Sequence, residues 1–304
     1  MKAKGTVGII GLGIMGGAFA TNLVKAGWRV IGYDTDPKRR RALTRVGVTI
    51  AEDATAVAAA APTVITSLPS PRALADTVAA IAAAGLKPRV VIEMSTFALD
   101  DKQAAERVLA KAGHTMLDCP VSGTGSQAKT GDIVVYASGD TKAVKKLRPM
   151  FGAFARGLHD LGTFGNGSRM KYVANLLVAI NNVASAEAMV LGMKAGLDPQ
   201  VIHDMVTTGA GNSRVFELRA PMMVKGRYDD ATMKIAVWQK DMQVIGDFAK
   251  SLRCPTPLFS ATGPVYGAAM AGGHGMHDTA AVCAVLEDMA GLRRGKKTKG
   301  RKRR

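Results

Sequence analysis

Residues 6–16 read TVGIIGLGIMG, a short apolar run that ends in three glycines spaced as Gly-x-Gly-x-x-Gly. The run predicts a buried strand, and the helical spacing of residues 18–25 predicts a helix directly after the glycines. In such a strand–turn–helix, Gly11 makes the tight turn, Gly13 lets the backbone approach a pyrophosphate and Gly16 lets the helix pack on the strand. The phosphates then lie at the helix N-terminus. The stretch therefore predicts a dinucleotide-binding turn formed by Gly11, Leu12, Gly13, Ile14, Met15 and Gly16.

The strand expected at residues 29–33 is followed by Asp34, 18 residues after Gly16. A carboxylate at this point accepts both ribose hydroxyls of NAD and repels the 2′-phosphate of NADP, so NAD is favoured. NADP stays possible, because residues 38–41 read KRRR and a basic side chain there can reach a 2′-phosphate.

Short β-branched runs alternate with alanine-rich helical segments as far as residue 118. We expect helices at 37–46, 53–60, 71–84 and 100–112 and strands near 47–50 and at 63–67, 90–93 and 115–118. This alternation indicates a parallel sheet covered on both faces, which binds ligands outside the carboxyl ends of its strands. The loops in that position contain Leu68 and Pro69, then Thr96, and then Ser122, Gly123 and Thr124. Ser122 with the free N–H groups of the next two residues can form a nest for a carboxylate.

Residues 165–175 read GNGSRMKYVAN and introduce a long apolar segment. Asn166 or Ser168 can cap a helix, and we expect a helix over residues 170–196 that is buried on nearly every face. Lys171 and Asn175 are four residues apart and project from the same face. Burial lowers the pKa of a lysine towards the range in which an amine exchanges protons. The alternative is a lysine that extends to solvent near the helix start.

Beyond residue 196 the pattern predicts helices only, at 199–206, 213–224, 233–252, 258–271 and 279–289. The predicted fold is α/β, an N-terminal Rossmann doubly wound sheet plus an all-α C-terminal domain joined by a long interdomain helix. We place an NAD(P)-binding domain at 1–165, a helical substrate and dimerisation domain at 166–291 and a disordered basic tail at 292–304. A helical domain that begins with a long buried helix often associates with a second copy of itself, so we expect a homodimer or homotetramer.

The net charge of +17 is concentrated at the C-terminus, because residues 293–304 carry nine lysines and arginines and leave +8 for the rest. The tail can add weak nonspecific affinity for nucleic acid, or act only as a solubilising end. The solubilising role is favoured, because no aromatic residue lies among the basic residues to stack on a base.

The three cysteines are scattered and form no CxxC pair, which indicates a reducing compartment and neither disulfides nor a zinc site. The N-terminus lacks an export signal, and charges and asparagines interrupt the longest apolar run. We expect a cytoplasmic protein that does not span a membrane. His274, His277 and Asp278 have ligand-like side chains, but no further cluster supports a metal site, and Asp278 is expected to form an interdomain hydrogen bond.

Six segments together resemble the motifs of the β-hydroxyacid dehydrogenase family, which includes 3-hydroxyisobutyrate dehydrogenase, tartronate semialdehyde reductase and threonate dehydrogenase. They are GLGIMGG, MST, DCPVSGTGSQAKTGD, GNGSRMKYVAN, Trp238 to Met242, and Pro255 to Asp278. The resemblance covers residues 5–290.

The resemblance implies NAD(P)-dependent hydride transfer with a small 3-hydroxy acid. Lys171 would be the general acid/base, and Asn175 would hold the substrate or Lys171. Ser122, Gly123 and Thr124 would bind the substrate carboxylate, Thr96 would lie beside substrate and nicotinamide, and Leu68, Pro69 and Lys240 would contact the cofactor.

This sequence departs from the family pattern at several positions. Thr124 replaces a usual glycine, Asp132-Ile133 a usual Thr-Leu, and Ala174 precedes a single asparagine. These changes leave the substrate open among 3-hydroxyisobutyrate, glycerate and threonate types, and Arg214 is a candidate second anchor for an acidic substrate or an ordinary surface arginine.

Two other functions are considered. An imine reductase of the same fold is disfavoured by the lysine at position 171. A non-catalytic, nucleic-acid-associated protein that binds through the basic tail is disfavoured by the same residue.

Overall fold

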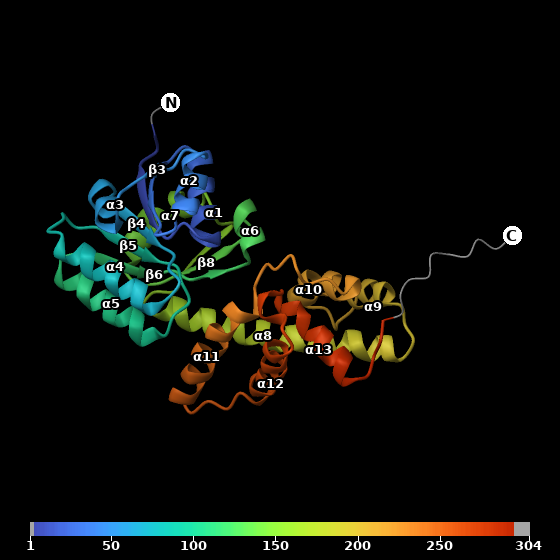
Figure 1. Cartoon of the computed structure of the whole chain (residues 1–304). Coiled ribbons are helices and arrows are strands. Elements are labelled where there is room, and N and C mark those ends of the chain that lie inside the picture. The colour runs from blue at the N-terminus through green and yellow to red at the C-terminus, as the bar shows by residue number, and fades with distance from the viewer. Residues whose placement is uncertain (1–2, 295–304) are drawn as a thin grey trace. The chain divides into compact units, whose positions relative to one another are not determined.

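The computed structural model describes residues 3–294 of the 304-residue chain. The chain divides into two compact units, residues 1–174 and 175–304. The division falls within helix α8 (Asn166–Lys194), whose first turns belong to the first unit (Figure 1).

A parallel six-stranded sheet forms the centre of the first unit, with strand order β3-β2-β1-β4-β5-β6. The strands are β1 (Thr6–Ile10), β2 (Arg29–Tyr33), β3 (Thr49–Ile50), β4 (Thr63–Thr66), β5 (Val90–Glu93) and β6 (Thr115–Asp118). Ile10 pairs with Tyr33 and Thr66, and Glu93 pairs with Thr66 and Asp118, so five strands end in line. The predicted parallel sheet is confirmed, and its order reverses between β1 and β4, where sheets of this kind bind ligands.

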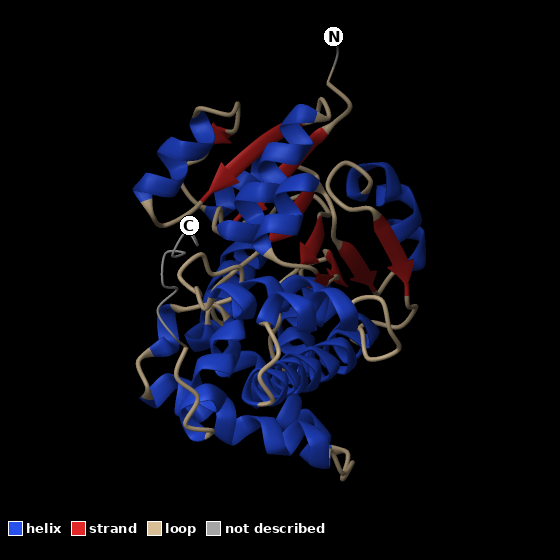
Figure 2. Cartoon of the chain, turned by 90° about the vertical axis from the view of Figure 1, so that its right-hand side faces the viewer, coloured by secondary structure: helices blue, strands red, loops and turns tan. Residues whose placement is uncertain are grey.

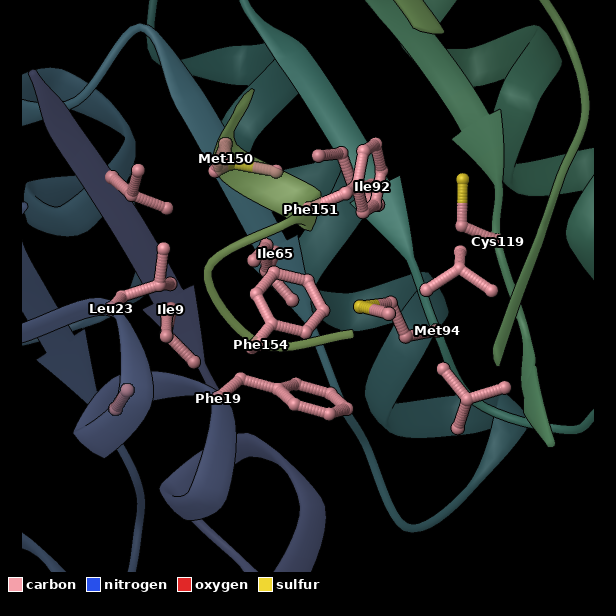
Figure 3. Close-up of a cluster of buried hydrophobic side chains, with 14 of the residues drawn as sticks. Ile9, Phe19, Leu23, Ile65, Ile92, Met94, Cys119, Met150, Phe151 and Phe154 are labelled. Carbon is pink, nitrogen blue, oxygen red and sulfur yellow. The ribbon is translucent and has the colours of Figure 1, made fainter. Parts of the chain in front are cut away.

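Helices cover both faces of this sheet (Figure 1). They are α1 (Ile14–Lys25), α2 (Pro37–Thr44), α3 (Ala54–Ala60), α4 (Pro71–Ala83) and α5 (Leu99–Lys111). One buried cluster packs α3, α4 and α5 against the strands. The other gathers aromatic side chains: Phe19 of α1 and Phe154 lie with ring centroids 4.9 Å apart, and Phe151 packs beside them (Figure 3).

A second, three-stranded sheet follows, and the sequence pattern did not predict it. β7 (Val121–Ser122) is antiparallel to β8 (Val134–Ala137), which is parallel to β9 (Gly157–Asp160). Helices α6 (Gly125–Thr130) and α7 (Thr141–Phe151) lie between these strands in the sequence. β7 has only two residues and β9 has no buried residue, so neither carries an apolar pattern strong enough to be read as a strand.

Helix α8 begins at Asn166, four residues before the expected start. The prediction that nearly every face is buried was wrong. Ala179, Ala186 and Met189 are fully buried, but Val173 and Leu177 are each 52% exposed and Leu191 is 73% exposed. An apolar pattern predicts that a helix is buried, but it does not say which elements bury it.

We expected no segment able to cross a bilayer, and this expectation also needs correction. By length and composition α8 is such a helix, the one found within residues 3–294, and 44% of its most apolar window is buried. A core helix of a globular domain passes the same test.

Residues 175–294 contain helices and loops and no strand, as predicted (Figure 2). The helices are the remainder of α8, α9 (Pro199–Val206), α10 (Arg214–Lys225), α11 (Ile235–Ser251), α12 (Pro257–Ala271) and α13 (Val282–Met289), with two short 3-10 turns, His274–Met276 and Thr279–Ala281. Asn182 joins them by donating from Nδ2 to the hydroxyl of Tyr266 (3.0 Å) and the carbonyl of Thr279 (2.9 Å).

The start of the predicted basic tail belongs to this unit. Arg294 donates from Nε to Glu287 Oε1 (3.1 Å) and from Nη1 to the carbonyl of Val224 (3.0 Å). The predicted disorder therefore does not apply to Arg294, because a buried carboxylate and free helix-end carbonyls engage it. The rest of the tail, residues 295–304, lies outside the described residues.

Candidate active site

The glycine turn has the geometry that a dinucleotide requires. Gly11 has a φ of +92°, and a Cβ on it would lie 2.1 Å from the carbonyl oxygen of Ser67. A Cβ on Gly16 would lie 1.9 Å from the carbonyl oxygen of Gly11. Helix α1 begins at Ile14, and its N-cap residue Gly13 provides no side-chain cap, so its first N–H groups are suited to binding a phosphate.

Asp34 lies against this turn at the end of β2. Its Oδ2 accepts the N–H of Leu12 (2.7 Å) and its Oδ1 accepts the N–H of Asp36 (2.8 Å). Arg39 Nη1 lies 3.3 Å from Oδ2 and is 53% exposed. Oδ1 keeps a second lone pair for a ribose hydroxyl, whereas Oδ2 accepts from both Leu12 and Arg39. Arg39 is also the basic group that could bind a 2′-phosphate.

The ends of β4 and β5 are joined by side-chain hydrogen bonds. Ser95 Oγ accepts the N–H of Leu68 (2.9 Å), and Glu93 Oε1 accepts the N–H of Ser95 (2.8 Å). The predicted cofactor residues Leu68 and Pro69 and the predicted nicotinamide neighbour Thr96 thus follow adjacent, cross-linked strand ends.

The loop predicted to bind the substrate carboxylate follows β7. Gly123 has a φ of +138°, and a Cβ on it would lie 2.6 Å from Ile133 Cγ2, so a glycine is required. The N–H of Thr124 donates to Gln127 Oε1 (3.0 Å) at the start of α6. Our prediction that this N–H is free was wrong, because Thr124 begins a helix and its amide is satisfied there. Ser122 and the amide of Gly123 remain candidates for the carboxylate.

A fully buried ammonium lies behind these loops. Lys102 of α5 has no exposed surface, and its Nζ lies 2.6 Å from Glu93 Oε2 and 2.8 Å from Asp118 Oδ1. Burial alone lowers the pKa of this lysine, but the charges of Asp118 and then Glu93 outweigh it and raise the pKa. Lys102 is therefore a cation at any physiological pH.

Asp118 also holds the start of α8. Its Oδ2 accepts the N–H of Ser168 (2.7 Å) and its Oδ1 accepts the hydroxyl of Ser168 (2.8 Å). A carboxylate at a helix N-terminus is favoured by the helix dipole. This cap from another strand explains why the helix begins earlier than expected, and it lies one turn before the partly buried Lys171.

Asp118 and Lys102 were missed by sequence reasoning. The available signal was the spacing of Lys102, Ala105 and Leu109 on the buried face of an amphipathic helix. Cys119 is buried beside them, and burial, together with the charge of Asp118, raises the pKa of its thiol, which makes it a poor nucleophile.

Two predicted site residues, Asn175 and Lys240, lie in the second unit. Asn175 is buried and donates from Nδ2 to Asp241 Oδ2 (2.9 Å), and Lys240 Nζ lies 2.9 Å from Asp241 Oδ1. Asp241 thus joins two predicted site residues, a role that its place in the segment Trp238 to Met242 did not predict.

Two other candidate residues have structural partners. Arg214 is exposed and bonds Glu217 (2.8 Å). Asp278 accepts hydrogen bonds from Thr232 and Ala280 of its own unit, and its expected interdomain hydrogen bond stays a prediction. Within residues 3–294, no three His, Cys, Asp or Glu side chains are arranged to hold a metal ion.

Comparison with known families covers nearly the whole chain. Residues 6–166 match the family described as the NAD binding domain of 6-phosphogluconate dehydrogenase. Residues 165–286 match the family described as the NAD-binding of NADP-dependent 3-hydroxyisobutyrate dehydrogenase.

Individual relatives are similar over their full length. The L-threonate dehydrogenase of Cupriavidus necator is 32% identical over 92% of this chain and 95% of its own. The L-threonate dehydrogenase of Escherichia coli K12 is 34% identical over 92% of this chain and 94% of its own. The crystal structure of a 3-hydroxyisobutyrate dehydrogenase from Salmonella typhimurium, 32% identical, superposes with a TM-score of 0.83 over 93% of this chain and 100% of that one. The chain belongs to the β-hydroxyacid dehydrogenase family and is an NAD(P)-dependent oxidoreductase.

Proposed function

We propose that this enzyme transfers a hydride between a small 3-hydroxy acid and its nicotinamide cofactor, with Lys171 as the general acid/base. The observation that carries the proposal is the double hydrogen bond of Ser168 to Asp118. It fastens the first turn of α8 to the carboxyl end of β6, the edge at which such sheets bind ligands. Lys171 follows one turn later, on a helix start that cannot fray.

The proposed reaction uses few groups of this chain. Ser122 and the Gly123 amide hold the substrate carboxylate, and Asn175 orients the substrate or Lys171. Neutral Lys171 accepts the hydroxyl proton as the carbinol hydrogen leaves as hydride, and its ammonium returns that proton in the reverse direction. When bound at Gly11 to Gly16, the nicotinamide cofactor supplies the hydride acceptor. Thr96 would lie beside the reacting atoms.

A threonate-type substrate is the candidate we favour. The named threonate dehydrogenases support it, as does the segment at residues 210–213 with Phe216 and Glu217, which resembles that branch of the family. Asn212 bonds Glu217 (2.8 Å) at the start of α10, so this segment has a defined shape. An imine substrate is disfavoured because Lys171 provides the acid/base that an alcohol requires.

The test is a panel of 2-hydroxy, 3-hydroxy and sugar acids with NAD and NADP, assayed for wild type and Lys171→Ala. We expect one 3-hydroxy acid to be oxidised, and kcat to fall about 10²–10⁴-fold in the variant with cofactor binding retained. Lys194→Ala, at the exposed far end of the same helix, is the matched control. Turnover in Lys171→Ala equal to wild type would refute the assignment.

We propose NAD as the preferred cofactor, supported by Asp34 beside the turn, with NADP as the alternative supported by Arg39. Lys240 is proposed to approach the cofactor from the second unit. We expect a higher kcat/KM with NAD, and Arg39→Ala to lower the residual NADP activity about tenfold while leaving that with NAD unchanged. A wild-type preference for NADP would reverse the proposal.

A homo-oligomer is proposed from the apolar stripe of α8, which includes Val173, Leu177 and Leu191. Covering it with a second copy removes apolar surface from water. Light scattering should show a dimer or tetramer that the double variant Leu177→Glu/Leu191→Glu dissociates; a monomeric wild type would exclude it.

We further propose that the enzyme works in the cytoplasm. The basic tail is proposed to add at most weak, salt-sensitive binding to nucleic acid. This binding is measurable as retention on immobilised DNA that is lost when residues 292–304 are deleted.

A further inference from the structure

One buried ammonium contacts the anchors of three segments that the proposed function uses. Lys102 lies within 2.8 Å of carboxylate oxygens on Glu93 and Asp118, which are the last residues of β5 and β6. Thr96 follows Glu93 by three residues, and Ser122 follows Asp118 by four. The lysine therefore holds the two strand ends from which the nicotinamide neighbour and the carboxylate-binding loop extend.

The third segment is reached through Asp118. Ser168 donates both its N–H and its hydroxyl to this carboxylate, and Lys171 follows three residues later. Ser138, the residue after β8, donates to Asp118 Oδ2 (3.3 Å) and accepts the N–H of Gly167 (2.9 Å). The start of α8 is thus bonded to the Asp118 carboxylate in two ways, directly by Ser168 and indirectly through the hydroxyl of Ser138.

The charges explain why a lysine is needed at this point. Two fully buried carboxylates repel each other, and the ammonium between them offsets this repulsion. Within residues 3–294, the polar contact of Glu93 Oε2 is this ammonium alone. Lys102 compensates both carboxylates, and the two oxygens of Asp118 accept both donors of Ser168 at once. Tyr172, next to Lys171, adds a further tie by donating to the carbonyl of Phe97.

We propose that Lys102 is a positioning residue of the reaction. It contacts neither substrate nor cofactor, and it fixes Thr96, Ser122 and Lys171 relative to one another by holding Glu93 and Asp118. This inference rests on the proposed function of Lys171. A displacement of about 1 Å in a reacting group can cost about 10²-fold in rate, so loss of the tie is expected in kcat. The glycine turn at Gly11 to Gly16 lies on another strand, so dinucleotide affinity should not change.

The main test is the double variant Lys102→Met/Glu93→Gln. Lys102, Glu93 and Asp118 together carry a net charge of −1, and the variant keeps −1 on Asp118 alone, so the tie is removed at an unchanged net charge. We expect kcat to fall about 100-fold and the dissociation constant for the dinucleotide, from fluorescence titration, to stay within about twofold. Hydrogen exchange should accelerate in the peptide at residues 163–172 and stay unchanged at residues 6–16.

Two further variants complete the design. Lys111→Met makes the same side-chain change at the exposed end of α5 and should behave as wild type in every measurement. Ser168→Ala removes one donor to Asp118 from a helix turn that tolerates alanine, and should lower kcat about tenfold with the same local gain in exchange. It decides the matter if the double variant does not fold.

The inference is overturned if kcat and exchange at residues 163–172 match wild type in the double variant, or in Ser168→Ala where the double variant cannot be obtained. It is also overturned if protection from hydrogen exchange is lost throughout the first unit together with dinucleotide affinity, because Lys102 would then stabilise the fold alone. An active Lys171→Ala enzyme removes the proposed function itself, whereas an inactive one beside unimpaired Lys102 and Ser168 variants removes only this inference.

Discussion

Asp118 in the first unit and Asp278 in the second are both fully buried carboxylates with a cation beside them. Asp118 accepts from a backbone N–H, two hydroxyls and Lys102. Asp278 accepts from the N–H groups of Thr232 and Met233, from a hydroxyl and from Arg219. In each case a buried negative charge is kept by a paired cation and several hydrogen bonds.

The two clusters differ in what the cation joins. Lys102 is shared between two carboxylates, on neighbouring strands that lead into the candidate site. Arg219 pairs with Asp278 and also donates to Thr232, so it fastens one loop of the helical unit to the turn at Thr279–Ala281. A buried carboxylate with a paired cation can therefore orient reacting groups in one unit and hold a loop in the other.

The largest expected effect comes from removing each charge without changing side-chain shape. Asp118→Asn and Asp278→Asn each break a buried ion pair and should lose about 3–5 kcal/mol of unfolding free energy, measured in urea. At a temperature where both are folded, Asp118→Asn should lower kcat about 100-fold, because the start of α8 loosens. Asp278→Asn should stay within about threefold of wild type. Equal losses of kcat would contradict the distinction between the two clusters.

A smaller effect is expected from paired glycine substitutions. Gly123→Ala places a Cβ at positive φ and against Ile133, so it should raise KM for the acid about tenfold and lower stability. Gly263 lies within α12 with nothing within 4 Å of its Cβ position. Gly263→Ala should instead raise the free energy of unfolding by about 1 kcal/mol and leave the kinetics unchanged. Steady-state kinetics and thermal melts check both; an unchanged KM in Gly123→Ala would remove this loop from substrate binding.

The smallest expected effect concerns two buried tyrosines. Burial raises the pKa of Tyr172 to about 12, and it does the same for Tyr266. Because each folded value exceeds the ordinary value of 10.0, the stability these phenols contribute is complete below pH 10 and is lost as the pH rises towards 12.

Tyr172→Phe and Tyr266→Phe should therefore each cost about 1 kcal/mol near neutral pH and make unfolding less sensitive to pH above 10. Only Tyr172→Phe should also lower kcat, about threefold, since its hydroxyl ties α8 to the loop that carries Thr96. Urea unfolding at pH 8, 10 and 11 with parallel assays tests this; a pH slope that matches wild type in both variants would contradict it.

Features that depend on neighbouring residues were predictable from the sequence. The glycine spacing and the alternation up to residue 118 predicted the turn and the six parallel strands, because strand, turn and helix signals are local. The helices of the second unit were found in the same way, with ends that differ by at most three residues. The motifs in order also indicated the family and the candidate residues Ser122, Lys171 and Asn175.

Tertiary structure alone decided the points that depend on residues far apart in the chain. Asp118 caps a helix 50 residues later, and Lys102 meets its two carboxylates only where folding brings the ends of β5 and β6 together. The amide of Thr124 is satisfied by a side chain of the helix that follows it, and the exposed stripe of α8 depends on which elements cover that helix. A buried charge is stable only where folding brings its partners together, so its role is a property of the fold and not of the local sequence.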